Sequence, residues 1–241
     1  MAVDYPIKDK YNIEDLLEIM RILRAPGGCP WDAEQNHESI KKNFIEETYE
    51  VIEAVNKQDV ELLKEELGDV LLQVVFHTIM EEEKNSFVFN DVTDGICKKL
   101  IERHPHVFGE VSVSGTEDVL TNWDAIKRNS KKQKTTTQAM DAVPRELPAL
   151  MRAQKLQAKA AKAGAELQMN AADYVSEKAS GLADGVNENN IGELLFAVTA
   201  VARQNGIDAE EALTNVSDAF LASFGEYEKS REDDASPSLY N

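Results

Sequence analysis

The sequence has few cysteines and few positive charges. Cys29 and Cys97 are its only cysteines, and neither has a histidine or cysteine at the spacing of metal ligands. We therefore expect two reduced thiols, without a disulfide or a zinc site. There are 26 Lys and Arg against 44 Asp and Glu, giving a formal net charge of −18 and a pI near 4.6. Because binding to a phosphate backbone needs a basic surface, this charge argues against nucleic acid as a partner.

Long apolar runs are also missing. Residues 1–12 contain no apolar run of the kind that a signal peptide has, and no segment reaches the roughly 18–20 apolar residues of a membrane span. We expect a cytoplasmic protein with no membrane contact. The composition, 42% hydrophobic and 29% charged, is typical of a globular chain. A chain of 241 residues is long enough for one large or two modest cores.

Residues 44–80 predict two helices joined by a turn at residues 56–59. In the first helix, apolar side chains recur at helical spacing and form one stripe. In the second helix, the segment 70–80 is almost entirely apolar. A helix that apolar is buried on most of its circumference. The hairpin is therefore expected to form a large part of the core.

Four carboxylates stand on facing sides of this hairpin. Glu47 and Glu50 lie one turn apart on the first helix, and Glu66 and Asp69 share a face of the second. Acids at the head of a buried helix must be protonated, reached by Lys or Arg, or held by a cation. If a cation is present, an all-carboxylate donor set favours magnesium or manganese over zinc or a di-iron centre. Because magnesium is usually completed by substrate phosphates, a phosphate hydrolase follows as a hypothesis.

Two basic residues and one aromatic residue are further candidates. Lys99 and Arg103 lie four positions apart, on one face of a predicted helix, where they could receive phosphate oxygens. The alternatives are a solvated basic edge or ion pairs with the hairpin acids. Trp31 could stack on a base or fill the core. Asp32 with Gln35 fits a helix capping box, the alternative being a place in the rim of the site.

The composition changes after the first half of the chain. Residues 123–142 are polar, basic and rich in threonine, which is typical of a linker. The following stretch is rich in alanine and lysine and strongly favours a helix. We place a first domain at 1–125, a linker at 126–143, a second domain at 144–230 and a disordered tail at 231–241.

The second domain partly repeats the first. Residues 191–198, IGELLFAV, resemble residues 67–74, LGDVLLQV, which indicates a duplicated helical unit. Asn190 stands where the first copy has Glu66, and no acidic pair matches the pair on the first helix. The second copy therefore lacks the residues for a firm cation site.

Six short motifs follow one another along the chain. They are CPWD at 29–32, EETYE at 46–50, ELGD at 66–69, KLIERHPHVFG at 99–109, W-x-x-x-K at 123–127 and LPALMRAQKLQ at 147–157. In this order they resemble the MazG family of nucleoside triphosphate pyrophosphohydrolases. The resemblance is close over about residues 10–165, and the remainder is similar to a degenerate second MazG unit.

The resemblance implies an all-α fold of duplicated helical bundle units, usually assembled as a homodimer. It implies hydrolysis of (d)NTPs to (d)NMPs and diphosphate with Mg2+, or Mn2+ as the alternative, in nucleotide-pool housekeeping. The residues it implicates are Glu47, Glu50, Glu66 and Asp69 as metal ligands, Glu46 as the residue that orients or deprotonates water, and Lys99 and Arg103 as contacts to the triphosphate. Trp31 remains a candidate substrate contact.

The chain also departs from the family pattern. Full-length members commonly keep the acidic motif in both units, so its loss from the second copy implies one working site per chain. Two alternatives stay open. One is a catalytically weak nucleotide-binding or regulatory protein, and the other is a pyrophosphohydrolase for a specialised nucleotide such as phosphoribosyl-ATP. No residue that reads the base can be named from the sequence.

Overall fold

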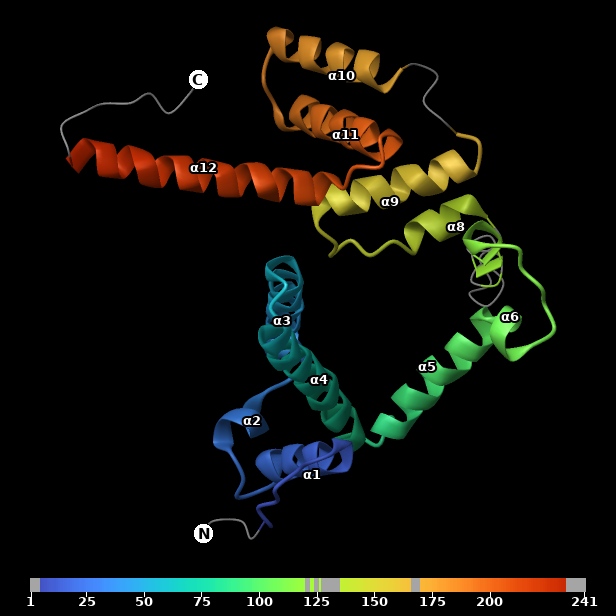
Figure 1. Ribbon diagram of the computed structural model, residues 1–241, viewed down its shortest axis with the longest axis vertical. Coiled ribbons are helices and arrows are strands. Elements are labelled where there is room, and N and C mark those ends of the chain that lie inside the picture. Colours follow the sequence, from blue (N-terminus) through green and yellow to red (C-terminus); the bar gives the residue numbers. More distant parts are fainter. Residues whose placement is uncertain (1–4, 120–121, 124–125, 127–134, 166–169, 233–241) are drawn as a thin grey trace. The chain divides into compact units, whose positions relative to one another are not determined.

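The chain folds into two compact units, residues 1–119 and 120–241, which are described separately. The computed structural model describes residues 5–119, 122, 123, 126, 135–165 and 170–232 (Figure 1). Within these residues every regular element is a helix, as the all-α prediction requires. None of the described helices combines the length and the apolarity needed to cross a membrane.

Six helices of the first unit have both of their ends among the described residues. They are α1 (Ile13–Arg24), α2 (Pro30–Glu34), α3 (His37–Lys57), α4 (Val60–Glu83), α5 (Phe89–Arg103) and α6 (Pro105–Phe108). The side chain of Asn36 caps α3 and, with Ser39, forms its capping box. The predicted cap at Asp32 is wrong, because Asp32 lies inside the short helix α2, which begins at Pro30.

Helices α3 and α4 form the predicted hairpin. The turn between them consists of Gln58, which adopts a left-handed conformation with φ 55°, and Asp59, whose carboxylate caps the first turn of α4. The core of the unit lies where the apolar segment of α4 packs against α1 and the start of α3. Its buried members are Leu17, Met20, Ile40, Val75, Phe76, Ile79 and Met80.

Polar contacts hold the two helices together at the end of the hairpin opposite its turn. The Nδ1 atoms of His37 and His77 lie 2.7 Å apart, so one ring must donate a proton and the other accept it. The Nε2 atom of His37 lies 2.6 Å from a carboxylate oxygen of Glu81, whose pKa is lowered to about 2 by Lys84, His37 and Ser86. This network ties the first turn of α3 to the last turns of α4.

Helix α5 leaves the hairpin at the end of α4 (Figure 1). It makes its main contacts with α4 and α6, and apolar side chains along it, including Ile96 and Leu100, are exposed. Apolar side chains of the hairpin, including Ile45 and Val55, are exposed as well. The stripe that the sequence places on the first hairpin helix is therefore only partly covered within one chain.

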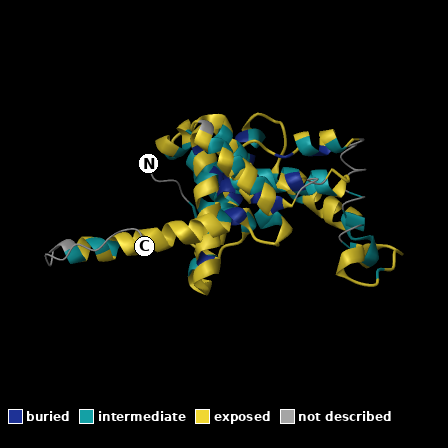
Figure 2. Ribbon diagram, turned by 90° about the horizontal axis from the view of Figure 1, so that it is seen from above, coloured by how far each residue is buried: buried dark blue, intermediate teal, exposed yellow. Residues whose placement is uncertain are grey.

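The second unit is also helical throughout its described residues. Its elements are α8 (Thr136–Asp141), α9 (Ala149–Lys162), α10 (Ala171–Ser180), the 3-10 helix η1 (Gly181–Asp184), α11 (Glu188–Gln204) and α12 (Ala209–Glu232). Helix α11 packs against α9 and α10. Helix α12 is exposed along most of its length, as Figure 2 shows.

Two predicted boundaries need correction. The predicted linker at 126–143 contains α8, which the Thr135 hydroxyl caps and whose Ala139 is buried, so that part is structured. The predicted tail begins inside α12, which continues to Glu232. The rest of that tail, and residues 127–134 of the linker, lie outside the described residues.

Candidate functional site

Three of the four predicted metal ligands form one cluster in the first unit. Glu47 of α3 and Glu66 and Asp69 of α4 each offer a carboxylate oxygen, and these oxygens all lie within 4.8 Å of one another. Glu66 is buried, and the other two side chains are half-buried. The hairpin turn determines this meeting, because it folds α3 back so that Glu47 faces the first turns of α4.

Burial and mutual repulsion together govern the electrostatics of this cluster. Burial raises the pKa of Glu47, and the Asp69 and Glu50 carboxylates raise it further. Burial likewise raises the pKa of Glu66, and Glu50 and then Asp69 add to it. Glu50 is exposed, and its effect on both pKa values indicates that its carboxylate lies near those of Glu47 and Glu66. Within the described part of the chain, none of these four carboxylates forms an ion pair.

The donor set fits a hard divalent cation. Only carboxylate oxygens face one another in the cluster, and oxygen ligands suit magnesium and manganese. A cation would oppose both causes of the raised pKa values of Glu47 and Glu66, which are burial and then the neighbouring carboxylates. Buried acids can be protonated, paired with Lys or Arg, or bound to a cation. The described contacts pair no Lys or Arg with these acids, so protonation and a cation are the two options that remain.

The other predicted site residues are not part of the cluster. Glu46 is exposed on α3. Lys99 is exposed and Arg103 half-buried on α5, and α5 begins beside the end of α4 that lies opposite the acids. Asp69 and Glu83, the last residue of α4, are about 20 Å apart along the helix at 1.5 Å per residue, and α5 runs away from α4 in Figure 1. The structure of one chain therefore does not bring Lys99 and Arg103 to the carboxylates.

Trp31 and the cysteines can be placed as well. Trp31 lies on α2 with 59% of its surface exposed, so the prediction that it fills the core is wrong. Its exposed ring remains a candidate for stacking. Cys29 and Cys97 are both free, as expected from the sequence.

Sequence reasoning overlooked one residue beside the cluster, Gln73. It lies one turn beyond Asp69 on α4, retains only 7% exposure, and its amide lowers the pKa of Glu47. The signal was a polar residue inside an almost wholly apolar segment, four positions after an acid of the cluster.

The matching region of the second unit holds an internal ion pair. In the register of the sequence repeat, Glu193 of α11 matches Asp69, and its carboxylate lies 3.0 Å from the Nζ atom of Lys178 on α10. Lys178 lowers the pKa of Glu193, and Asn189 donates a hydrogen bond to the same carboxylate at 3.1 Å. Asn190, which matches Glu66, donates to the carbonyls of Gly181 and Gly185. Both side chains are thus occupied by protein contacts.

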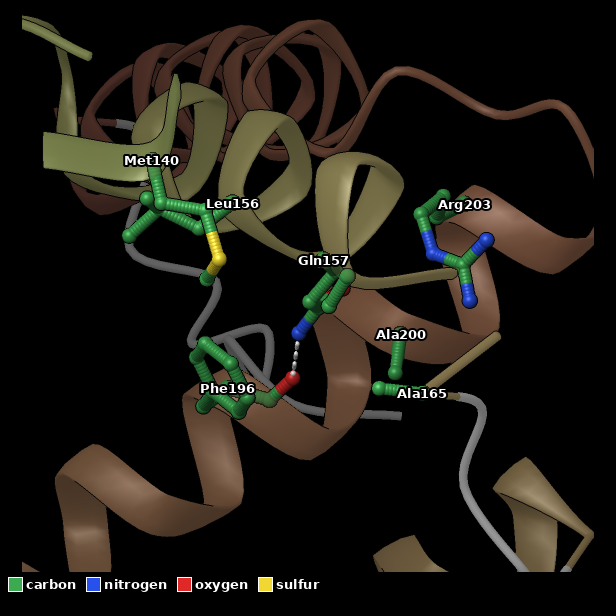
Figure 3. Close-up of a pocket in the computed structure, with 8 residues that line it drawn as sticks. Met140, Leu156, Gln157, Ala165, Phe196, Ala200 and Arg203 are labelled. Carbon is green, nitrogen blue, oxygen red and sulfur yellow. Dashed lines mark hydrogen bonds between the residues drawn. The ribbon is translucent and has the colours of Figure 1, made fainter. Parts of the chain in front are cut away.

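The second unit also has a cavity of about 260 Å³ between α8, α9 and α11 (Figure 3). Most of its lining is apolar, including Met140, Leu156 and Phe196. Gln157 points across it and donates to the Phe196 carbonyl at 2.8 Å, as the dashed line in Figure 3 marks. No acid lines this cavity, so it does not offer a second cation site of the same kind.

Comparison with known proteins identifies the family of this chain. Residues 35–108, which span the acidic hairpin, match the MazG nucleotide pyrophosphohydrolase domain. The nucleoside triphosphate pyrophosphohydrolase of Escherichia coli strain K12 is 40% identical over 230 residues, covering 90% of this chain and 88% of that protein. The nucleoside triphosphate pyrophosphohydrolase/pyrophosphatase MazG of Thermotoga maritima is 37% identical, covering 92% and 87%. With such similarity along most of both sequences, the chain belongs to the MazG family of nucleotide pyrophosphohydrolases.

Proposed function

We propose that the first unit hydrolyses nucleoside triphosphates, ribo or deoxy, to the monophosphate and diphosphate in a magnesium-dependent reaction. The observation that carries the proposal is the cluster of Glu47, Glu66 and Asp69, with oxygens within 4.8 Å of one another and no basic partner among the described residues. The names of the relatives from Escherichia coli and Thermotoga maritima support the reaction and the substrate class. The protein would act in the cytoplasm on the nucleotide pool.

Each site residue has a defined task in this proposal. Glu47, Glu50, Glu66 and Asp69 hold Mg2+, or Mn2+ in its place. Magnesium supplies Lewis-acid stabilisation of the charge that develops on the phosphate oxygens. Glu46, which is exposed on the same helix, orients or deprotonates the attacking water. The water attacks phosphorus, the P–O bond to the diphosphate breaks, and the diphosphate leaves with the bonding electron pair.

Lys99 and Arg103 are proposed to neutralise the triphosphate, and Trp31 to stack on the base. Because one chain does not bring α5 to the acids, a second copy of the chain is proposed to complete the site as a homodimer. The uncovered apolar side chains of the first unit, such as Ile45, Val55 and Ile96, support this assembly. Their burial would contribute about 25 cal/mol per Å² of apolar surface removed from water.

The test is turnover of each common NTP and dNTP with Mg2+, followed by separation of the nucleotide products. The expected products are nucleoside monophosphate and diphosphate in equal amounts. Formation of nucleoside diphosphate and inorganic phosphate would show that the attack occurs at a different phosphorus and would refute the proposed reaction.

The same panel separates the alternative functions. Phosphoribosyl-ATP is included beside the common nucleotides, and binding is measured by calorimetry in parallel. Tight Mg2+-dependent binding of a dNTP without turnover would favour the nucleotide-binding or regulatory protein. Turnover confined to phosphoribosyl-ATP would identify the specialised enzyme.

A further inference from the structure

Helix α2, which carries the exposed Trp31, has no apolar anchor of its own. It is five residues long, and none of these residues is buried. A helix this short is not stable by itself in water, and helices in proteins are mostly stabilised by an apolar face that packs on the core. Because α2 lacks such a face, its position depends on polar contacts with neighbouring elements. The direction of the Trp31 ring depends on the same contacts.

The side chain of Arg24, at the end of α1, supplies such contacts to the end of α2. Its Nη1 atom donates hydrogen bonds to the carbonyl oxygens of Asp32 at 2.5 Å and of Gln35 at 3.2 Å. The Gln35 side chain in turn donates from Nε2 to the Trp31 carbonyl at 2.8 Å. Carbonyl groups at the end of a helix lack intrahelical partners and accept such donors readily. Arg24 therefore binds the backbone that follows Trp31.

Arg24 is itself fixed on α4. Its Nε and Nη2 atoms donate to the two carboxylate oxygens of Glu83 at 2.6 and 2.8 Å. Its guanidinium carbon lies 5.3 Å from the centroid of the Phe76 ring, which belongs to the core. The Arg24 side chain retains only 7% exposure. A planar guanidinium can bind a carboxylate at two points, stack on a ring and donate further hydrogen bonds at the same time. Arg24 thus connects α2 with the core.

The start of α2 is held to α1 by different contacts. The backbone N–H of Cys29 donates to the Leu23 carbonyl at 2.7 Å. A Cβ atom at Gly28 would lie 2.2 Å from the Ile22 carbonyl oxygen, so only glycine permits this close approach. These contacts fix where α2 begins. The direction in which it then runs depends on its other end, which Arg24 holds.

We propose that Arg24 is a positioning residue for Trp31. Fixed on α4, it binds the carbonyls at the end of α2 and so sets the direction in which the exposed Trp31 ring projects. The functional consequence rests on the proposed function, because that function assigns Trp31 to stacking on the nucleotide base. Loss of the Arg24 contacts would weaken nucleotide binding and leave the metal-binding carboxylates in place.

The first test is fluorine NMR of the full-length protein labelled with fluorotryptophan. The chain has two tryptophans, and Trp31→Phe identifies the signal that belongs to Trp31. Arg24→Met keeps an unbranched side chain but removes every hydrogen-bond donor of the guanidinium. We expect the Trp31 signal of this variant to shift towards that of free fluorotryptophan, because the end of α2 is released. The signal of Trp123 should stay at its wild-type position.

Arg21→Met is the matched control. Arg21 lies one turn before Arg24 on α1 and makes the same kind of two-point contact with α4, donating to both carboxylate oxygens of Glu82 at 2.8 and 3.1 Å. Among the described contacts, none joins Arg21 to α2. Its replacement should leave the Trp31 signal unchanged.

Arg24→Lys is the second variant should Arg24→Met fold poorly. Lysine keeps a positive charge beside Glu83, so the variant should lose less stability. Its single ammonium group cannot reproduce the planar fork that serves a carboxylate and two carbonyls together. The Trp31 signal should therefore still shift in the same direction.

The second test separates KM from kcat. In Arg24→Met, the KM for a dNTP should rise by about 5–20-fold, part of the loss expected when a base loses an aromatic stacking partner. The kcat at saturating Mg2+ should stay within about 2-fold of wild type, because the interaction lost contributes to substrate binding. Combined with Trp31→Ala, Arg24→Met should raise KM no further than Trp31→Ala alone, since Arg24 acts through Trp31.

The outcomes separate this inference from the proposed function. An unchanged Trp31 signal in the folded Arg24 variants, or an equal shift in Arg21→Met, would overturn the positioning role. A shifted signal with wild-type KM in both Arg24→Met and Trp31→Ala would uphold the positioning role and refute base stacking by Trp31. A wild-type protein that does not hydrolyse nucleotides would refute the proposed function, and the fluorine signals would still decide the role of Arg24.

Discussion

The two units treat their acids in opposite ways. In the first, Glu47, Glu66 and Asp69 converge without a positive partner among the described residues, and the pKa values of Glu47 and Glu66 are raised. In the second, Glu193 lies 3.0 Å from the Lys178 ammonium, and its pKa is lowered. One unit leaves negative charge uncompensated, whereas the other compensates it with its own side chain.

The difference separates an acid that could bind a cation from one that already has a partner. The ammonium of Lys178 neutralises the Glu193 carboxylate and lowers its pKa. At the position that aligns with Glu66, the amide of Asn190 donates to the carbonyls of Gly181 and Gly185. The second unit therefore has a loop contact at the position where the first unit has a candidate metal ligand.

The largest expected effect that tests this comparison is on activity. Glu50→Ala and Asp69→Ala each remove a carboxylate from the first unit, and turnover of dNTP should fall by more than about 100-fold, beyond the loss caused by an outer-shell change. Glu193→Ala should alter turnover by less than about 2-fold, because its carboxylate is already neutralised. Initial rates of diphosphate release at saturating Mg2+ provide the measurement. Retained turnover in the first two variants would refute the assignment of the site.

The second expected effect is a pair of stability changes with opposite signs. The raised pKa of Glu66 means that the folded, metal-free protein loses stability as pH rises above the ordinary value of 4.5. Glu66→Gln should therefore raise the melting temperature at pH 7, by roughly 2–4 °C. The lowered pKa of Glu193 contributes stability that is present above pH 4.5 and lost as pH falls through the folded value, so Glu193→Gln should lower the melting temperature at pH 7.

Melting curves in chelator at pH 7 and pH 4 measure both changes. Each difference from wild type should shrink at pH 4, where the acids become protonated in the unfolded chain. Mg2+ should then stabilise the wild type and not Glu66→Gln, because a ligand that binds only the folded state raises its stability. Changes of the same sign at pH 7 would mean that the two units do not differ as described.

The smallest expected effect concerns the lysine of the second unit. Lys178→Met leaves Glu193 without its counter-charge, and the melting temperature should fall by no more than about 3 °C, since partly exposed ion pairs contribute little. Turnover should not change. A titration of Lys178→Met with Mn2+ should show no additional bound ion, because Asn190 and Glu193 do not amount to a carboxylate cluster. A second bound equivalent would show that Lys178 alone blocks a metal site there.

The hairpin and its acids could be predicted from the sequence because both depend on local rules. Helical spacing placed Glu66 and Asp69 on one face of α4, and the turn at residues 56–59 lies at Gln58 and Asp59 as predicted. The capping residue of α3 was misassigned because Asp32 and Asn36 are both suitable caps. Only the end of the short helix α2 decides between them.

Other features depend on contacts between elements and could not be predicted. The exposure of Trp31 follows from its place on the outside of α2, and a pattern of neighbouring residues does not contain that information. The pairing of Lys178 with Glu193 joins α10 to α11 across a loop. The helix α8 lies in a stretch whose composition is typical of a linker, and it is stabilised where Ala139 and Val143 become buried.

By itself, the sequence determined the all-helical class, the acidic hairpin and the resemblance to one enzyme family, and it predicted the four carboxylates of the candidate site. These follow from residue type and helical period, which act within a few turns of chain. Only the tertiary structure decided which acids lie within 4.8 Å of one another, that Gln73 is buried on the same helix as two of them, and that Lys178 neutralises Glu193. Such contacts depend on the relative position of two packed helices. A small shift in that packing changes which side chains meet.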